Sequence, residues 1–275
     1  MKVTVIYGGK SGEHEISLVS AAAVARNIDL KNEVQLIAIT KGGRWFLQPH
    51  SEFERIKSDS KASFKIIEDE SNEVSVIPGG GTERTFRVGS EILSSDVIFP
   101  VLHGPFGEDG TIQGLFEMVD VPYVGCTTLG SAITMDKEKT KVALAQAGIP
   151  VVPGICVRRS DLATANGYDK ILEKAQKELG FPLFVKPCAA GSSDGATLAK
   201  DLQHLNGAII EAFLWDDKIL IEKAVNAREI ECSVTGNPTI DDDSCTAEKL
   251  MAYGPGEIAP KHDFYDYDAK YNDPD

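Results

Sequence analysis

Short apolar segments alternate with segments of helical periodicity along most of this chain. Residues 3–7 are typical of a buried strand, residues 13–27 carry apolar side chains three and four positions apart, and residues 34–40 are typical of a second strand. Further strands are predicted at 96–101, 183–187 and 218–222, and further helices at 111–119, 136–147 and 168–179. Because strands that alternate with helices build helix-covered sheets, this order predicts an α/β architecture.

The length and composition narrow the class of protein. At 275 residues the chain exceeds what one hydrophobic core usually serves, so two or three domains are expected. A net charge of −14 argues against nucleic acid or an anionic membrane as a partner. The five cysteines are widely spaced and form no Cys-x-x-Cys pair, which favours free thiols and a cytoplasmic location.

A lysine in an apolar strand is the first sign of a binding site. Lys186 lies in the predicted strand 183–187, where an ammonium group is costly unless it meets a strong anion. Residues 188–195 follow directly as a loop of small and hydroxyl residues, whose backbone N–H groups suit phosphate oxygens. Neither Gly-x-x-x-x-Gly-Lys-Ser/Thr nor a dinucleotide Gly-x-Gly-x-x-Gly motif after a strand occurs, so a nucleoside triphosphate site of another kind is predicted.

Six short blocks, in order over nearly the whole chain, resemble the D-alanine–D-alanine ligase family. They are residues 8–17, 103–111, 135–137, 185–187 with 191–193, 221–223 and 264–271. The resemblance implies an N-terminal doubly wound (pre-ATP-grasp) domain followed by an ATP-grasp domain that is incomplete at the C-terminus. The corresponding boundaries are 1–125 for the substrate-binding α/β domain, 126–217 for the central subdomain and 218–275 for the start of the C-terminal subdomain with its lid loop.

The resemblance also implies a reaction. One D-alanine carboxylate attacks the γ-phosphate of ATP to give a D-alanyl phosphate, and the amine of a second D-alanine displaces phosphate to form D-alanyl-D-alanine for peptidoglycan. ATP, D-alanine and Mg²⁺ (or Mn²⁺) are the expected ligands, and a homodimer is the expected assembly. Such a transfer depends on positioning and on charge neutralisation by lysines, backbone N–H groups and the metal.

Three residues are assigned to the reaction centre on this basis. Glu13 begins a predicted helix, where the helix dipole alone would favour a carboxylate, but the family assigns it to the ammonium of the first D-alanine. His103 follows a predicted strand and could be a simple turn residue, whereas the resemblance implies substrate contact. Ser192 is expected to line the reaction centre in a network with Glu13.

The ATP contacts divide between the phosphates and the nucleoside. Lys137 and Lys186 are assigned to the triphosphate, although the charged sequence around Lys137 would suit a solvated lysine equally well. The backbones of Ser192 and Ser193 are expected to hold the γ-phosphate. Asp194 departs from the small aliphatic residue of many members, and an anion beside phosphate is unfavourable unless it points outward.

Four residues at the start of the expected subdomain 218–275 are assigned to adenosine. Glu222 is expected to accept a hydrogen bond from the adenine amino group, and Glu229 from the ribose hydroxyls. The backbones of Lys223 and Val225 are expected to meet the adenine edge. Without the resemblance, ordinary surface acids would explain both glutamates in so acidic a chain.

Lys270 and Tyr271 close an aromatic, acidic segment that the resemblance identifies as a lid over the active site. A tyrosine at position 271 resembles the dipeptide-forming members more than those that make a D-alanyl ester.

The sequence ends at Asp275, before the region in which the family carries its metal ligands, so no metal site is assigned. We expect a fragment that makes no dipeptide by itself. The alternatives are another ATP-grasp carboxylate–amine ligase, a D-alanine–D-lactate ligase and an inactive nucleotide-binding fragment.

Overall fold

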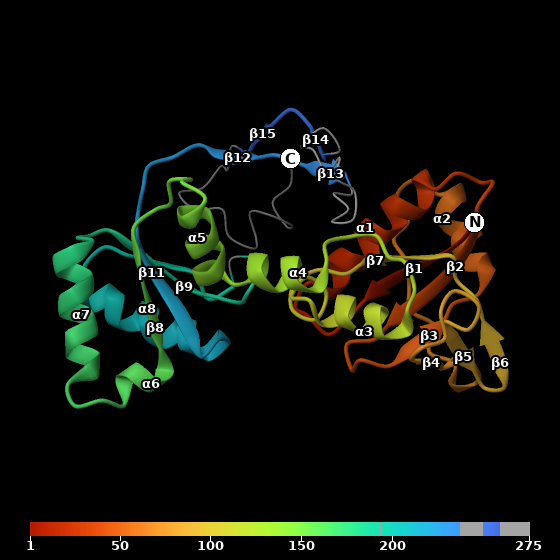
Figure 1. Ribbon diagram of the computed structural model, residues 1–275, viewed down its shortest axis with the longest axis horizontal. Coiled ribbons are helices and arrows are strands. Elements are labelled where there is room, and N and C mark those ends of the chain that lie inside the picture. Colours follow the sequence, from red (N-terminus) through yellow and green to blue (C-terminus); the bar gives the residue numbers. More distant parts are fainter. Residues whose placement is uncertain (193, 237–249, 259–275) are drawn as a thin grey trace. The chain divides into compact units, whose positions relative to one another are not determined.

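The computed structural model describes residues 1–192, 194–236 and 250–258, and it divides the chain into two compact units. The first unit runs from Met1 to Lys223 and the second begins at Ala224. The expected α/β class is confirmed (Figure 1). The predicted boundaries 1–125, 126–217 and 218–275 stay a prediction.

A mostly parallel sheet organises the N-terminal part of the first unit. Its order is β3-β2-β1-β7, in which β1 (Lys2–Gly8) pairs in parallel with both β2 (Glu33–Ile39) and β7 (Val97–Val101). The short strand β3 (Trp45–Leu47) adds an antiparallel edge. The chain leaves β1 toward β2 on one side and later returns to β7 on the other, so the carboxyl ends of β1 and β7 lie at a topological switch point.

Both faces of this sheet are covered because its central strands are apolar on both sides. One face packs on α1 (His14–Asn27) and α2 (His50–Ser58). The other packs on α3 (Thr111–Val119) and on a small antiparallel sheet of β4 (Val74–Val76), β5 (Phe86–Val88) and β6 (Glu91–Leu93). Helix α4 (Thr128–Met135) and the 3-10 turn η1 (Glu70–Asn72) complete this part.

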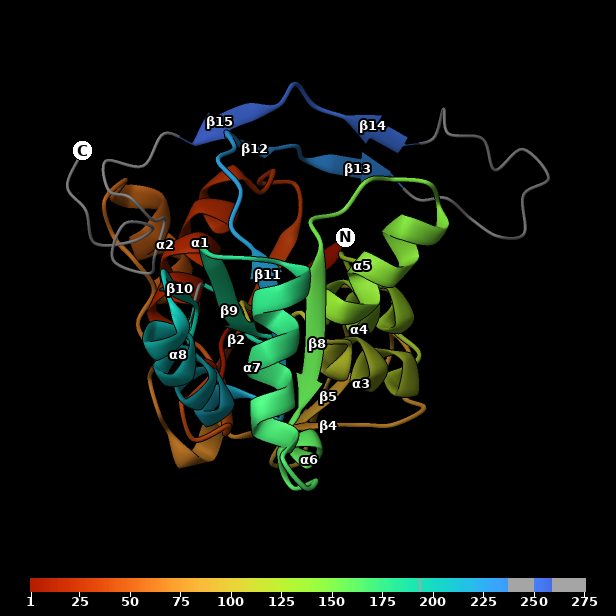
Figure 2. The same cartoon turned by 90° about the vertical axis from the view of Figure 1, so that its left-hand side faces the viewer.

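An antiparallel sheet of order β10-β9-β11-β8 organises the rest of the first unit. Its strands are β8 (Gly154–Arg158), β9 (Leu183–Pro187), β10 (Thr197–Ala199) and β11 (Lys218–Lys223). Helices α7 (Gly167–Glu178) and α8 (Leu202–Trp215) lie in front of β9 and β11 in Figure 2, and the short helix α6 (Arg159–Leu162) follows β8.

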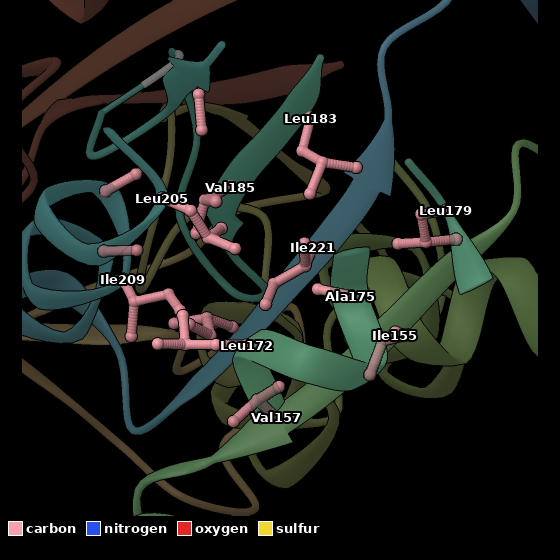
Figure 3. Close-up of a cluster of buried hydrophobic side chains, with 14 of the residues drawn as sticks. Ile155, Val157, Leu172, Ala175, Leu179, Leu183, Val185, Leu205, Ile209 and Ile221 are labelled. Carbon is pink, nitrogen blue, oxygen red and sulfur yellow. The ribbon is translucent and has the colours of Figure 1, made fainter. Parts of the chain in front are cut away.

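The core of this second sheet fixes which residues point away from α7 and α8. Val185, Ile219 and Ile221 pack with residues of α7 and α8 such as Leu172 and Leu205 (Figure 3). Since neighbouring residues of a strand point to opposite faces, Lys186 and Glu222 lie on the other face. Helix α5 (Lys137–Gln146) reaches that face, because its side chains bond to Lys218 and Glu222 there.

The second unit consists, in its described part, of two short strand pairs. Strand β12 (Glu229–Glu231) pairs with β15 (Gly256–Ile258), and β13 (Val234–Gly236) pairs with β14 (Leu250–Ala252). A bidentate ion pair from Arg228 to Glu257 ties the first pair together. No helix in the described ranges is long and apolar enough to cross a membrane.

Candidate functional site

Glu13 lies at the carboxyl end of the first sheet, directly before helix α1. Ser17, in the first turn of that helix, accepts a hydrogen bond from the Gly8 backbone N–H and donates one to the Val101 carbonyl. The helix therefore begins across the ends of both β1 and β7. The Ser11 hydroxyl accepts the Glu13 backbone N–H at 3.2 Å, and the Glu13 side chain is buried.

Two glycines leave space around the Glu13 carboxylate. A Cβ built on Gly104 would lie 2.5 Å from Glu13 Oε2, and one built on Gly191 would lie 3.1 Å from the same atom. Gly104 also has a φ of +68°, which side chains rarely adopt. The carboxylate therefore lies against both the loop that follows β7 and the loop that follows β9.

Ser192 makes the connection to Glu13 that the resemblance implied. Its hydroxyl donates a hydrogen bond to Glu13 Oε1, although 179 residues separate the two in sequence. Ser192 has a φ of +45°, in the left-handed region that non-glycine residues seldom occupy. This conformation belongs to the turn in which the Asp194 N–H donates to the Gly191 carbonyl.

His103 is held by neighbours on both sides. Its Nε2 lies 3.0 Å from the Ser20 hydroxyl of α1, and its Nδ1 lies 3.8 Å from Glu108. The backbone carbonyl of His103 accepts from Ser11 at 2.7 Å. The half-buried ring is thus placed beside the Glu13 turn.

Two acids after His103, Glu108 and Asp109, support the loop that leads to α3. Asp109 accepts hydrogen bonds from the backbone N–H groups of Phe106 and Thr111, each at 2.9 Å. Burial raises the pKa of Asp109, but these hydrogen bonds lower it by more, so the net shift of the pKa is downward. Glu108 accepts the Gly104 N–H at 3.1 Å.

Lys137 holds the beginning of the loop 188–195. Its Nζ donates to the Ala190 carbonyl at 2.6 Å, and its backbone N–H donates to the Cys188 carbonyl at 3.0 Å. Burial and the nearby Lys186 ammonium both lower the pKa of Lys137. The alternative of a solvated surface lysine is therefore wrong for this residue.

The two ends of the loop 188–195 lie against the C-terminal end of α8. The Ala189 N–H donates to the Asp216 carboxylate at 2.7 Å. At the other end, a Cβ on Gly195 would lie 2.5 Å from Trp215 and 2.9 Å from Pro187, so the backbone passes close to both. Asp194, between these anchors, has Oδ2 3.7 Å from the Cβ position of Gly12 and so faces the glycine turn after β1.

Lys186 and Glu222 face each other across neighbouring strands. Lys186 Nζ forms an ion pair with Glu222 Oε2, and Lys141 of helix α5 pairs with Glu222 Oε1. Gly154 on β8 leaves room for the glutamate, because a Cβ there would lie 3.1 Å from Glu222 Cγ. The anion that meets Lys186 in this structure is therefore a protein carboxylate.

Sequence reasoning did not find Lys141. The available signal was its spacing: it lies four residues after Lys137, and residues four apart share one face of a helix. The charged run around it favours a solvated helix, so the spacing alone does not distinguish Lys141 from its neighbours.

The remaining predicted residues are less constrained by the structure. Lys223 ends β11, and its backbone N–H donates to the Pro153 carbonyl at 3.1 Å. Val225 and Glu229 are exposed and belong to the second unit. Ser193, Lys270 and Tyr271 lie outside the described residues. Within residues 1–192, 194–236 and 250–258, no group of three or more His, Cys, Asp or Glu side chains could hold a metal ion.

Two family profiles match this chain. The profile described as D-ala D-ala ligase N-terminus matches residues 2–126, and that of the D-ala D-ala ligase C-terminus matches residues 143–275. The D-alanine--D-alanine ligase of Treponema denticola is 51% identical over 100% of this chain and 72% of its own length. That of Treponema pallidum (strain Nichols) is 43% identical over 98% of this chain and 65% of its own length.

Solved structures of ligases are also similar to this chain. The VanG D-Ala:D-Ser ligase from Enterococcus faecalis aligns with a TM-score of 0.76 at 35% identity, over 97% of this chain and 72% of the other. The D-alanine-D-alanine ligase from Coxiella burnetii aligns with a TM-score of 0.76 at 30% identity, over 94% of this chain and 71% of the other.

Proposed function

Because the chain belongs to the D-alanine–D-alanine ligase family, we propose that it joins two D-alanine molecules with ATP to form D-alanyl-D-alanine for peptidoglycan synthesis. This family uses ATP and generally requires metal ions. The observation that carries the proposal is the hydrogen bond from Ser192 to Glu13, which joins the loop assigned to phosphate with the carboxylate assigned to substrate.

Glu13 anchors the ammonium of the first D-alanine in this proposal. Its buried carboxylate supplies the negative charge, and the adjacent His103 contacts the substrate from the end of β7. Ser192 contributes its hydroxyl to the same centre. The carboxylate of that D-alanine then attacks the γ-phosphate, and the resulting D-alanyl phosphate reacts with the second amine.

ATP occupies the face of the sheet β10-β9-β11-β8 that carries Lys186 and Glu222, opposite α7 and α8. Lys137 and Lys186 neutralise phosphate charge, and backbone N–H groups of Ser192 and Ser193 bind the γ-phosphate. The adenosine contacts are assigned to Glu222, Lys223, Val225 and Glu229. Lys270 and Tyr271 are assigned to the lid.

The metal, the assembly and the location are also part of the proposal. We assign Mg²⁺ or Mn²⁺ as the ion, although no group of three or more His, Cys, Asp or Glu side chains among the described residues could hold it. A homodimer in the cytoplasm is proposed from the family. The domain division at 125 and 217 is retained as part of the same proposal.

A ligase with another acceptor is the second candidate, since the chain is also similar to a D-Ala:D-Ser ligase. The test uses protein expressed from the complete reading frame and measures phosphate release from Mg-ATP with D-alanine. Release that depends on D-alanine and yields D-alanyl-D-alanine supports the proposal, and L-alanine is the negative control. When D-serine or D-lactate competes as acceptor, faster formation of the mixed product than of D-alanyl-D-alanine would favour the second candidate. If no phosphate release depends on D-alanine, both candidates are refuted.

A further inference from the structure

Helix α5 presents two lysines to two different parts of the ATP site. Lys137 and Lys141 are four residues apart and therefore share one face of the helix. Lys137 Nζ donates to the Ala190 carbonyl in the loop 188–195, whereas Lys141 Nζ donates to Glu222 Oε1. One helix face thus serves both the loop and the carboxylate on β11.

Glu222 divides its two carboxylate oxygens between two lysines. Lys141 pairs with Oε1 and Lys186 pairs with Oε2, while the glutamate side chain is only 9% exposed. Burial raises the pKa of Glu222, but the hydrogen bonds from Lys141 and Lys186 lower it by more, so the net shift of the pKa is downward. A buried carboxylate that loses its last partner is strongly disfavoured as an anion.

The two lysines differ in what binding of ATP requires of them. Lys186 lies two residues before Cys188, where the loop begins, and its ammonium is the one assigned to phosphate. When this ammonium turns to the triphosphate, Glu222 gives up one of its two donors. Lys141 approaches from α5 on the other oxygen, so its bond can persist through that exchange.

We infer that Lys141 is a positioning residue that keeps the Glu222 carboxylate aimed at the adenine amino group while Lys186 binds phosphate. Lys141 thereby contributes to the choice of an adenine nucleotide. The inference rests on the proposed function, in which Glu222 accepts a hydrogen bond from the adenine amino group.

The test is nucleotide preference, which a purely structural role would not change. ATP and inosine triphosphate differ at the 6-position, where inosine carries an oxo group in place of the amino donor. Both dissociation constants are measured by calorimetry for the full-length protein and for Lys141→Met, which keeps the aliphatic stem. We expect the preference for ATP to fall about tenfold in the variant, the effect of losing one charge-assisted hydrogen bond. A structural role would weaken both nucleotides equally.

Two control variants are needed to interpret the ratio of the two dissociation constants. Lys139→Met removes an exposed lysine of the same helix that pairs with Glu138, and we expect it to keep the native preference. Glu222→Gln should lose the preference if Glu222 reads the amino group. Should Lys141→Met not fold, Lys141→Gln is measured instead, and a lower preference is again expected.

The possible outcomes separate the two claims. If Glu222→Gln loses the preference and Lys141→Met keeps it, the role of Lys141 is refuted while the adenine contact of Glu222 stands. If the native protein shows no preference, or Glu222→Gln retains it, the assignment of Glu222 in the proposed function is refuted, and the inference falls with it.

Discussion

The Ser192 hydroxyl donates to Glu13 Oε1, and this bond joins the loop after β9 to the beginning of helix α1. Glu13 is buried, and its carboxylate lies beside Gly104 and Gly191, whose missing side chains leave it space. A cation that binds a buried carboxylate forms strong charge-assisted hydrogen bonds, which offset the cost of burying the charge. The ammonium of an amino acid is the cation that the proposed function supplies.

Replacement of Glu13 by Gln tests this assignment directly. The amide keeps the size and one acceptor oxygen for Ser192, but it removes the charge that would pair with the ammonium. We expect the KM for D-alanine to rise about ten- to a hundredfold, as for the loss of a charged hydrogen bond, with little change in the affinity for ATP. Initial rates over a range of D-alanine concentrations, with calorimetry for ATP, measure both quantities.

Glu15→Gln is the matched control for Glu13→Gln. Glu15 lies two residues later on α1, is 66% exposed, and pairs with Lys41 at 2.8 Å. Because exposed pairs contribute little, its replacement should leave the KM for D-alanine unchanged. Equal KM values in Glu13→Gln and the native protein would remove Glu13 from the substrate site.

The predictions from sequence succeeded where local pattern and burial agree. Residues of β1 and β9 alternate or run apolar strongly enough to predict strands, and Lys186 is conspicuous because its strand is apolar. Glu13 and Ser192 were placed together by family resemblance, since no local pattern connects residues so far apart.

The failures came where long-range packing decides. Residues 50–90 are rich in charged side chains, yet the structure places strands β4 and β5 of the small antiparallel sheet there. It also buries Phe53, Phe64 and Phe86 in two cores, which the irregular spacing of these aromatics did not indicate. Likewise, Lys137 and Lys141 differ from Lys139 through partners that are distant in sequence, in the loop 188–195 and on β11.

A methyl group at Gly195 should disturb the loop 188–195. Gly195 has a φ of +68°, and a Cβ there would lie 2.5 Å from Trp215 and 2.9 Å from Pro187. We expect Gly195→Ala to lower the free energy of unfolding by about 1–3 kcal/mol, through left-handed strain and overlap. The affinity for ATP should fall as well, because Gly195 ends the loop that carries Ser192.

Gly207→Ala is the control for the methyl group itself. Gly207 lies on α8, is exposed, and has no atom within 4 Å of its Cβ position. We expect this variant to gain about 0.5–1 kcal/mol of stability and to bind ATP normally. Urea denaturation and calorimetry check both variants, and unchanged ATP affinity in Gly195→Ala would show that the loop tolerates the shift.

Lys218 should stabilise the first unit in a pH-dependent way. Its Nζ contacts Glu138 at 2.9 Å and also pairs with Asp136. The hydrogen bond from Lys218 holds the pKa of Glu138 at about 2, below its ordinary value of 4.5. Burial raises the pKa of Asp136, but the bond from Lys218 gives a net lowering.

The sign of the effect follows from these depressed values. Between about pH 4.5 and 2 the unfolded chain binds protons that the folded carboxylates do not, so stability falls as the pH is lowered through this window. Lys218→Met should be less stable than the native protein at pH 7, and the difference should shrink toward pH 2. Urea denaturation at a series of pH values measures this difference in stability.

Lys31→Met, which breaks an exposed pair with Asp29, should show almost no such difference, because solvent screens that pair. A difference for Lys218→Met that persists unchanged to pH 2 would mean that packing of the lysine stem, rather than its charge, provides the stability.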